Sequence, residues 1–160
     1  MKKWNGYFAL LVLVGTGTAN AQEQEITMVY EAALTTAGSR GVGLYYNSTN
    51  GDLTTGIGFR VHFNSSLVEI VDIKNHHENS NLGLQIMQDS DDLDDDPSTD
   101  AYINAAWVDL LGNWPDVESL PAVLYSLEYR ATRAAGDDDL FKITPIATAA
   151  GFDFAARIVR

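Results

Sequence analysis

The residues most capable of chemistry are crowded into one acidic segment, residues 89–100, in which seven of twelve residues are aspartate. Oxygen-bearing side chains recur at every second position, at Asp92, Asp94, Asp96, Ser98 and Asp100. A Ca²⁺ ion takes about six to eight oxygen ligands, and alternating acidic residues in a curled loop supply several of them. The spacing therefore predicts a calcium site with a structural role. Pro97 and Ile103 replace the Gly and Glu of an EF-hand loop, so the remaining ligands must come from elsewhere.

A solvated acidic loop that keeps the protein in solution is the alternative interpretation of residues 89–100. The carboxylates of one such loop repel each other, and surface screening relieves that repulsion only in part. A bound cation removes the conflict, and this favours calcium. The shorter acidic run at residues 137–139 is predicted to be a solvated turn.

Two aromatic residues are candidates for contact with a ligand. Trp114 lies in a segment rich in Gly, Asn and Pro, which predicts a loop. In a loop, Trp114 could stack on a sugar ring, anchor a protein partner, or fold back as a lid over the open end of the domain. Tyr45 and Tyr46 are consecutive on an expected strand, so one must face away from the core, and Tyr46 is the second ligand-binding candidate. Trp107 is in phase with Ile103 and is predicted to be a core residue.

The sequence contains no recognisable catalytic constellation. His76 and His77 are adjacent, and adjacent histidines rarely bind one zinc ion, so residues 76–78 are predicted to form a solvated loop. There is no Gly-rich phosphate loop, G-x-S-x-G elbow or H-E-x-x-H helix. Among 22 acidic residues, accidental carboxylate pairs are inevitable. A non-enzymatic protein is therefore expected, with a glycoside hydrolase as the less favoured alternative.

The elements expected to position these residues are strands. Apolar residues at Ile57, Phe59, Val61 and Phe63 alternate with others such as His62, which is typical of a strand with one buried face. Further strand signals occur at residues 25–32, 42–46, 67–73, 84–88, 102–109, 123–130, 140–144 and 152–158. Clusters of Asn, Ser, Gly and Asp between them predict turns. The pattern predicts an all-β fold of about nine strands, a two-sheet antiparallel sandwich of jelly-roll type.

The N-terminal residues have the composition of an export signal. Lys2 and Lys3 precede an apolar run at residues 7–14, and Ala19-Asn20-Ala21 forms an A-x-A site. A spanning helix needs about 20 apolar residues, so this run is too short for one. We predict a signal peptide at residues 1–21, cleavage before Gln22, and a secreted protein, extracellular or periplasmic, with no membrane insertion after cleavage.

Charge and cysteine content exclude further classes of partner and site. The chain has 10 Lys and Arg residues against 22 Asp and Glu residues, a formal net charge of −12. A phosphate backbone would be repelled over most of such a surface, so nucleic acid is not an expected partner. The sequence has no cysteine, which removes disulfides and thiolate metal sites. With 46% hydrophobic residues, residues 22–160 are expected to form one domain with its own core.

Two stretches of the sequence carry a resemblance to a known family. Residues 55–70 resemble the early part of cohesin domains, in which an alternating strand runs into a Tyr/Phe-Asp/Asn-x-x-Leu turn, here Phe63-Asn64-Ser65-Ser66-Leu67. Residues 92–125, with Ala106-Trp107-Val108-Asp109 and Gly112-Asn113-Trp114-Pro115, look like cohesin-like domains of secreted bacterial proteins. The resemblance implies a nine-stranded jelly-roll sandwich. It also implies binding without catalysis, since cellulosomal cohesins bind dockerin modules through one flat sheet face.

These inferences combine into one functional expectation and one alternative. The expectation is a secreted, non-enzymatic, cohesin-like binding module that engages an extracellular protein module or a polysaccharide. A polysaccharide partner requires Trp114 and a surface Tyr side by side on one face. A protein partner requires a flat face of mixed polar and apolar residues without an aromatic row. The alternative is a structural subunit of an extracellular matrix or adhesin.

Overall fold

The computed structural model of the 160-residue chain describes residues 22–31, 38–131 and 140–160. The predicted signal peptide at residues 1–21 and the acidic turn at residues 137–139 lie outside these ranges. No helix within the described ranges is long and apolar enough to span a membrane.

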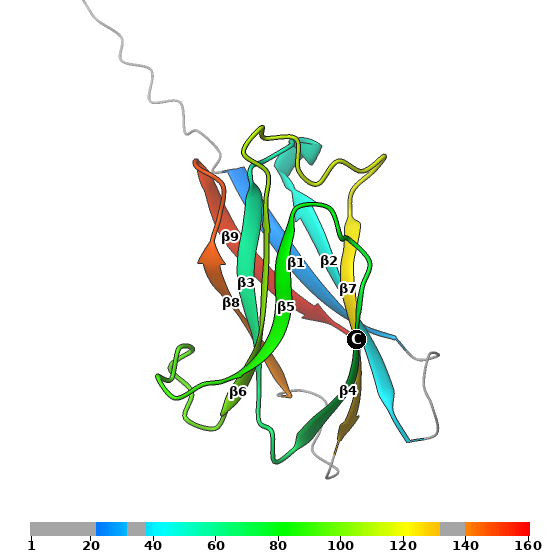
Figure 1. Cartoon of the computed structure of the whole chain (residues 1–160), viewed down its shortest axis with the longest axis vertical. Helices are drawn as coiled ribbons and strands as arrows, with labels where there is room; N and C mark the ends of the chain where they lie inside the picture. Colours follow the sequence, from blue (N-terminus) through cyan, green and yellow to red (C-terminus); the bar gives the residue numbers. More distant parts are fainter. Residues whose placement is uncertain (1–21, 32–37, 132–139) are drawn as a thin grey trace, which may run out of the picture.

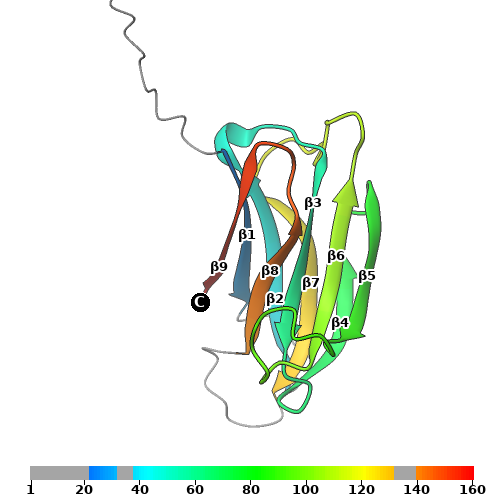
Figure 2. The ribbon, with the colours of Figure 1, turned by 90° about the vertical axis from the view of Figure 1, so that its left-hand side faces the viewer.

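The described residues form two sheets that face one another (Figures 1 and 2). In chain order the elements are β1 (Gln22–Glu31), β2 (Arg40–Ser48), the 3₁₀ turn η1 (Thr49–Gly51), β3 (Gly56–Phe63), β4 (Val68–Asn75), β5 (Asn81–Gln88), β6 (Ala101–Val108), β7 (Ala122–Ala131), β8 (Phe141–Ala147) and β9 (Phe152–Val159). One sheet, here named the β2 sheet, has the strand order β4-β7-β2-β1-β9. The other, named the β3 sheet, has the order β5-β6-β3-β8.

This architecture confirms the predicted all-β sandwich. Within the described ranges there are nine strands, one for each segment in which the sequence indicated a strand. The pairings are antiparallel apart from β1 with β9, which run parallel. Turn-forming residues separate consecutive strands, and Asn50 in η1 adopts a positive φ of 60°, which Asn tolerates.

The core lies between the sheets and is built from alternating residues of each strand. On β3 the inward side chains are the predicted ones, and all four are at most 3% exposed: Ile57, Phe59, Val61 and Phe63. Phe59 stacks against Trp107 and Tyr125, with ring centroids 6.1 Å away in both cases. Burying each large apolar side chain contributes roughly 1.5–3 kcal/mol. The prediction that Trp107 is a core residue is confirmed, because its side chain is 0% exposed.

A β-bulge changes the phase of β7, so its side chains do not alternate strictly between the two faces. Leu44 pairs with Tyr125 and Tyr45 pairs with Val123, so Leu124 is the extra residue. Both Leu124 and Tyr125 are 0% exposed, whereas Val123 is 38% exposed. A bulge inserts one residue into a strand and reverses the side-chain phase beyond it, so Val123 does not share the inward face of Tyr125.

Candidate functional site

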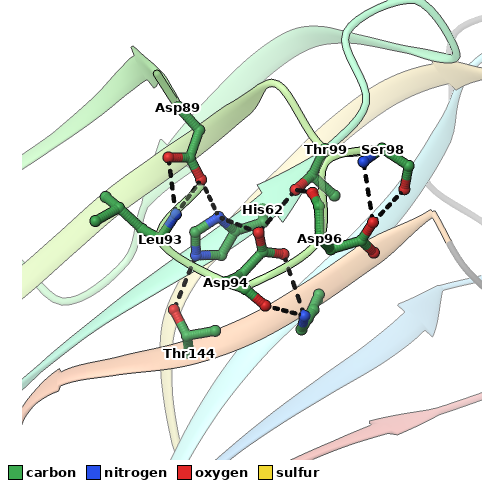
Figure 3. A network of polar contacts seen from close by, with 9 residues as sticks. His62, Asp89, Leu93, Asp94, Asp96, Ser98, Thr99 and Thr144 are labelled. Carbon is green, nitrogen blue, oxygen red and sulfur yellow. Dashed lines mark hydrogen bonds and ion pairs between the residues drawn. The ribbon is translucent and has the colours of Figure 1, made fainter. Parts of the chain in front are cut away.

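A buried histidine lies on the outer side of the β3 sheet. His62 alternates with the core residues of β3 and therefore points away from the sandwich interior. Its side chain is nevertheless 0% exposed, because the acidic loop, residues 89–100 between β5 and β6, folds over it (Figure 3). The loop and the strand together form a polar cluster, defined here as His62, Asp89 and Asp94.

The two ring nitrogens of His62 contact oxygen atoms from two different elements. His62 Nδ1 lies 3.0 Å from Asp89 Oδ2, at the start of the acidic loop. His62 Nε2 lies 2.8 Å from Thr144 Oγ1 on β8. Asp94 Oδ1 lies 3.8 Å from Nδ1. The side chains of all three cluster residues are 0% exposed, so charge on them is poorly solvated and interacts strongly.

Each carboxylate of the polar cluster is fixed by further donors (Figure 3). The backbone N–H of Leu93 donates to both oxygens of Asp89, at 3.1 and 3.3 Å. The Thr99 hydroxyl donates to Asp94 Oδ1 at 2.9 Å. Lys142 on β8 donates to the backbone carbonyl of Asp94, and its Nζ lies 3.5 Å from Asp94 Oδ2. The loop is therefore held to the sheet by charged and polar contacts.

The five predicted calcium ligands occupy different surroundings in the acidic loop. Asp94 points inward, and Asp92 lies exposed with a positive φ of 52°. Asp96 accepts bonds from the hydroxyl and N–H of Ser98, at 2.6 and 3.0 Å, and these bonds lower the pKa of Asp96. Among the described residues, the group of His and acidic side chains close enough to share an ion is His62, Asp89 and Asp94, so of the five only Asp94 belongs to it.

Asp100, the last of the five predicted ligands, is held from outside the acidic loop. Its two oxygens accept the backbone N–H and the hydroxyl of Ser65, at 2.6 and 2.7 Å. These bonds stabilise the ionised carboxylate, and the N–H of Ser65 is the largest cause that lowers the pKa of Asp100. Asn64 adds a bond from Nδ2 to the carbonyl of Ser98, at 2.6 Å. The turn between β3 and β4 thus holds the C-terminal part of the acidic loop through hydrogen bonds.

The expectation that Tyr46 and Trp114 are surface residues for ligand contact is wrong in this structure. Tyr46 is 0% exposed and Trp114 is 1% exposed, and their ring centroids lie 4.4 Å apart. The phenol of Tyr46 can be buried because Gln24 Nε2 donates to its oxygen at 3.0 Å. Trp114 pairs with Thr54 through two backbone bonds and closes the end of the sandwich, as the lid interpretation of this residue predicts. Tyr45 takes the outward position instead.

The prediction of a solvated loop at residues 76–78 is wrong for His77, which is buried, and is confirmed for its exposed neighbour His76. The ring of His77 meets the ring of Trp114 edge-on, with centroids 5.7 Å apart, and its carbonyl accepts the indole N–H of Trp107 at 2.7 Å. Burial lowers the pKa of His77, with the nearby Asp116 carboxylate opposing the shift. We name Tyr46, His77, Trp107 and Trp114 the aromatic cluster.

The outer face of the β3 sheet, beside the part that the acidic loop covers, carries a row of small residues next to a row of polar ones. Register places Gly83, Ala106, Gly58 and Ala147 in one row across the four strands. The next row is polar and contains Gln85, Asn104, Arg60 and Thr144. Ile146 packs over Gly58, where an added Cβ would lie 3.3 Å from Ile146 Cβ. This outer face therefore joins a polar row to a row of small residues, with Ile146 over one end of the small-residue row.

Apolar side chains frame this face. Met87, Val108 and Ile146 are 43%, 42% and 41% exposed. Beyond the end of β6, Leu110 and Leu111 project from a turn and are 90% and 83% exposed. In the described ranges, none of the exposed large hydrophobic side chains is aromatic. The face therefore has the mixed polar and apolar character that the sequence analysis associated with a protein partner.

The outer face of the β2 sheet carries a groove of about 430 Å³. Its lining includes the partly exposed Tyr45, the charged Asp72, Lys74 and Glu128, and Ser126, whose hydroxyl lies 2.9 Å from His76 Nε2. The groove therefore combines one aromatic side chain with charged and apolar ones.

Comparison with solved structures assigns the fold. The sixth cohesin from scaffoldin B of Acetivibrio cellulolyticus, solved in complex with a dockerin, is similar over 86% of this chain and 98% of that chain, with 10% identity and a TM-score of 0.50. The chain has a cohesin-like fold. The cohesin CaCohA2 from Clostridium acetobutylicum is similar over 86% of this chain and 91% of that chain, with 12% identity and a TM-score of 0.45. No protein-family model and no curated protein sequence matches.

His62 is the residue of interest that sequence reasoning placed correctly but did not single out. Its phase opposite the core residues of β3 was evident, and that phase predicts an outward side chain. Its burial depends on Asp89, 27 residues later, and on Thr144, 82 residues later. A lone histidine in the outward phase of a strand, followed by an acidic segment, was the available signal.

Proposed function

We propose that this protein is a secreted, non-enzymatic binding module whose partner is another protein, bound by the outer face of the β3 sheet. The observation that carries the proposal is the mixed character of this face, with the polar row through Asn104 beside the small-residue row through Ala106. A face with a polar row and scattered apolar side chains suits a protein surface. Similarity in fold to a cohesin that binds a dockerin supports a protein partner.

A polysaccharide partner is less well supported. Recognition of a sugar chain relies on aromatic rings that stack on successive sugar rings, and Tyr46 and Trp114 are both buried. Tyr45, in the groove on the β2 sheet, is one partly exposed ring within a charged surrounding. The outer face of the β3 sheet is therefore the better candidate for the principal binding surface.

The leader composition of residues 1–21, with two lysines, an apolar run and an A-x-A site, supports export.

Calcium binding by Asp92, Asp94, Asp96, Ser98 and Asp100 stays a prediction. A Ca²⁺ ion in the acidic loop would replace the serine donors of Asp96 and Asp100. Thermal unfolding of the purified protein in EDTA and in millimolar CaCl₂ tests it, and equal midpoints would contradict it.

The binding proposal is tested by placing one large charged side chain on each outer face. Ala106→Arg fills the small-residue row of the β3 sheet, and Ser126→Arg fills the groove of the β2 sheet as the matched control. Both proteins and the wild type are applied to an array of extracellular protein modules, dockerins included, and of polysaccharides. We expect a protein signal that A106R loses at least ten-fold and S126R retains. A polysaccharide signal lost only in S126R would contradict the proposal.

A further inference from the structure

We propose that the polar cluster binds a divalent transition-metal cation of the Zn²⁺ type, with His62 Nδ1, one oxygen of Asp89 and one oxygen of Asp94 as ligands. One ligand atom from each of these residues lies within 4.8 Å of the others. Nδ1 is 3.0 Å from Asp89 Oδ2 and 3.8 Å from Asp94 Oδ1. Ligand atoms that each lie about 2.0–2.2 Å from one zinc ion are separated from one another by distances similar to these two. Small side-chain shifts therefore suffice for coordination.

The donor types select the class of ion. One imidazole nitrogen with two carboxylate oxygens suits Zn²⁺ and related transition metals, whereas Ca²⁺ prefers oxygen ligands throughout. Asp94 belongs both to this set and to the predicted calcium set, but His62 and Asp89 do not belong to the latter. The proposed zinc-type site is therefore a different site, and it does not depend on the proposed protein-binding function.

Each proposed ligand is already oriented by a neighbouring group (Figure 3). When Nδ1 binds the ion, the proton of His62 resides on Nε2 and is donated to Thr144 Oγ1, 2.8 Å away. The N–H of Leu93 holds Asp89, and the hydroxyl of Thr99 holds Asp94. Such outer contacts fix the tautomer and the direction of metal ligands. The strand and the loop thus present the three donors without further rearrangement of the backbone.

A buried atom without a hydrogen-bond donor points independently to a ligand. Asp94 Oδ2 receives no hydrogen bond within the described part of the chain, although its side chain is 0% exposed. The neighbouring cation is Lys142 Nζ, 3.5 Å away at the end of a side chain that is 43% exposed. Asp94 pairs with this lysine, whereas Asp89 contacts the imidazole and the N–H of Leu93, and a buried carboxylate without sufficient positive charge is costly. A divalent ion supplies that charge.

The test uses zinc itself as the probe. The purified protein is stripped with EDTA, dialysed, and unfolded by heat with increasing ZnSO₄, with CaCl₂ in parallel. At a free zinc concentration about 100 times the dissociation constant, we expect the midpoint to rise on the order of 10 °C. Co²⁺ added in place of Zn²⁺ should develop the visible absorption of a low-symmetry site with a nitrogen ligand.

Three variants assign the effect to the cluster. His62→Gln removes the nitrogen ligand and should abolish the zinc shift, whereas His76→Gln removes an exposed histidine and should leave it unchanged. Lys142→Gln removes the competing charge and should tighten zinc binding several-fold while its fold is retained. If H62Q does not fold, K142Q still decides the matter, because unchanged affinity in K142Q overturns the proposal.

Other outcomes also count against the site. No midpoint shift with millimolar zinc overturns the proposal, and so does a shift that H76Q loses and H62Q keeps. A larger shift with Ca²⁺ than with Zn²⁺ would assign the loop to an oxygen-only site instead.

Discussion

A loop covers the sandwich near each end of β3, and each of the two loops buries one histidine. The surroundings of the two histidines differ, because one is aromatic and the other is polar and charged. At the start of β3, the loop after β6 covers His77 with the ring of Trp114. At the other end, the acidic loop covers His62 with carboxylates and a threonine hydroxyl. The aromatic cluster excludes water by packing, whereas the polar cluster needs its charges paired. The first arrangement stabilises the fold by packing of neutral rings, and the second depends on how its charges are neutralised.

The largest expected effect comes from removing the central ring of the aromatic cluster. Trp114→Ala leaves a cavity beside Tyr46 and Trp107 and should lower the free energy of unfolding by about 4 kcal/mol. Urea unfolding measures it. Leu111→Ala in the same loop is the control, because Leu111 is 83% exposed, and it should cost less than about 0.5 kcal/mol. Equal losses in both variants would show that the loop, and not its buried ring, carries the stability.

A smaller loss is expected when the polar cluster loses one charge. Asp94→Asn keeps the shape of the side chain but removes the carboxylate that accepts from Thr99 and lies beside Lys142, and should cost about 1 kcal/mol at neutral pH. Asp95→Asn changes an exposed neighbour in the same loop and should be within about 0.5 kcal/mol of the wild type. Chemical unfolding at low and at high salt measures both. If D94N is as stable as D95N, the comparison between the two ends fails.

The smallest effect is a pH dependence that originates in the aromatic cluster. Burial lowers the pKa of His77 below its usual 6.5, so the unfolded chain binds a proton at this residue before the folded protein does. The stability due to neutral His77 is therefore fully present above pH 6.5 and is lost as the pH falls from there through the lower pKa of the folded state. Thermal midpoints between pH 7.5 and about pH 5 should decline less in His77→Gln than in the wild type.

Exposed His76 supplies the control for that pH dependence. His76→Gln removes a histidine with a solvent-exposed ring, so its midpoints should follow the wild-type curve. If the midpoints of H77Q fall with pH as steeply as those of the wild type, the pH dependence originates in another group. Protonation of the aromatic cluster would then make no contribution to it.

Local sequence patterns were sufficient for most of the fold and for only part of the candidate site. Alternation is a property of neighbouring residues, so the inward phase of Phe59 could be read directly. The bulge at Leu124 could not, because it arises from pairing with β2, about 80 residues away along the chain. Similarly, adjacent residues of a strand point to opposite faces, so the sequence shows that one of Tyr45 and Tyr46 points outward. It does not show which one, because Tyr46 is buried through its contacts with Gln24 and Trp114.

The sequence by itself determined that this chain forms strands, that its turns are rich in aspartate, and that its acidic residues concentrate in one loop. Those features follow from side-chain type and spacing over a few residues. Only the tertiary structure decided that the acidic loop closes over His62 and that Trp114 closes the opposite end. Contacts between residues 27 or more positions apart depend on strand register and sheet order, which local spacing does not encode.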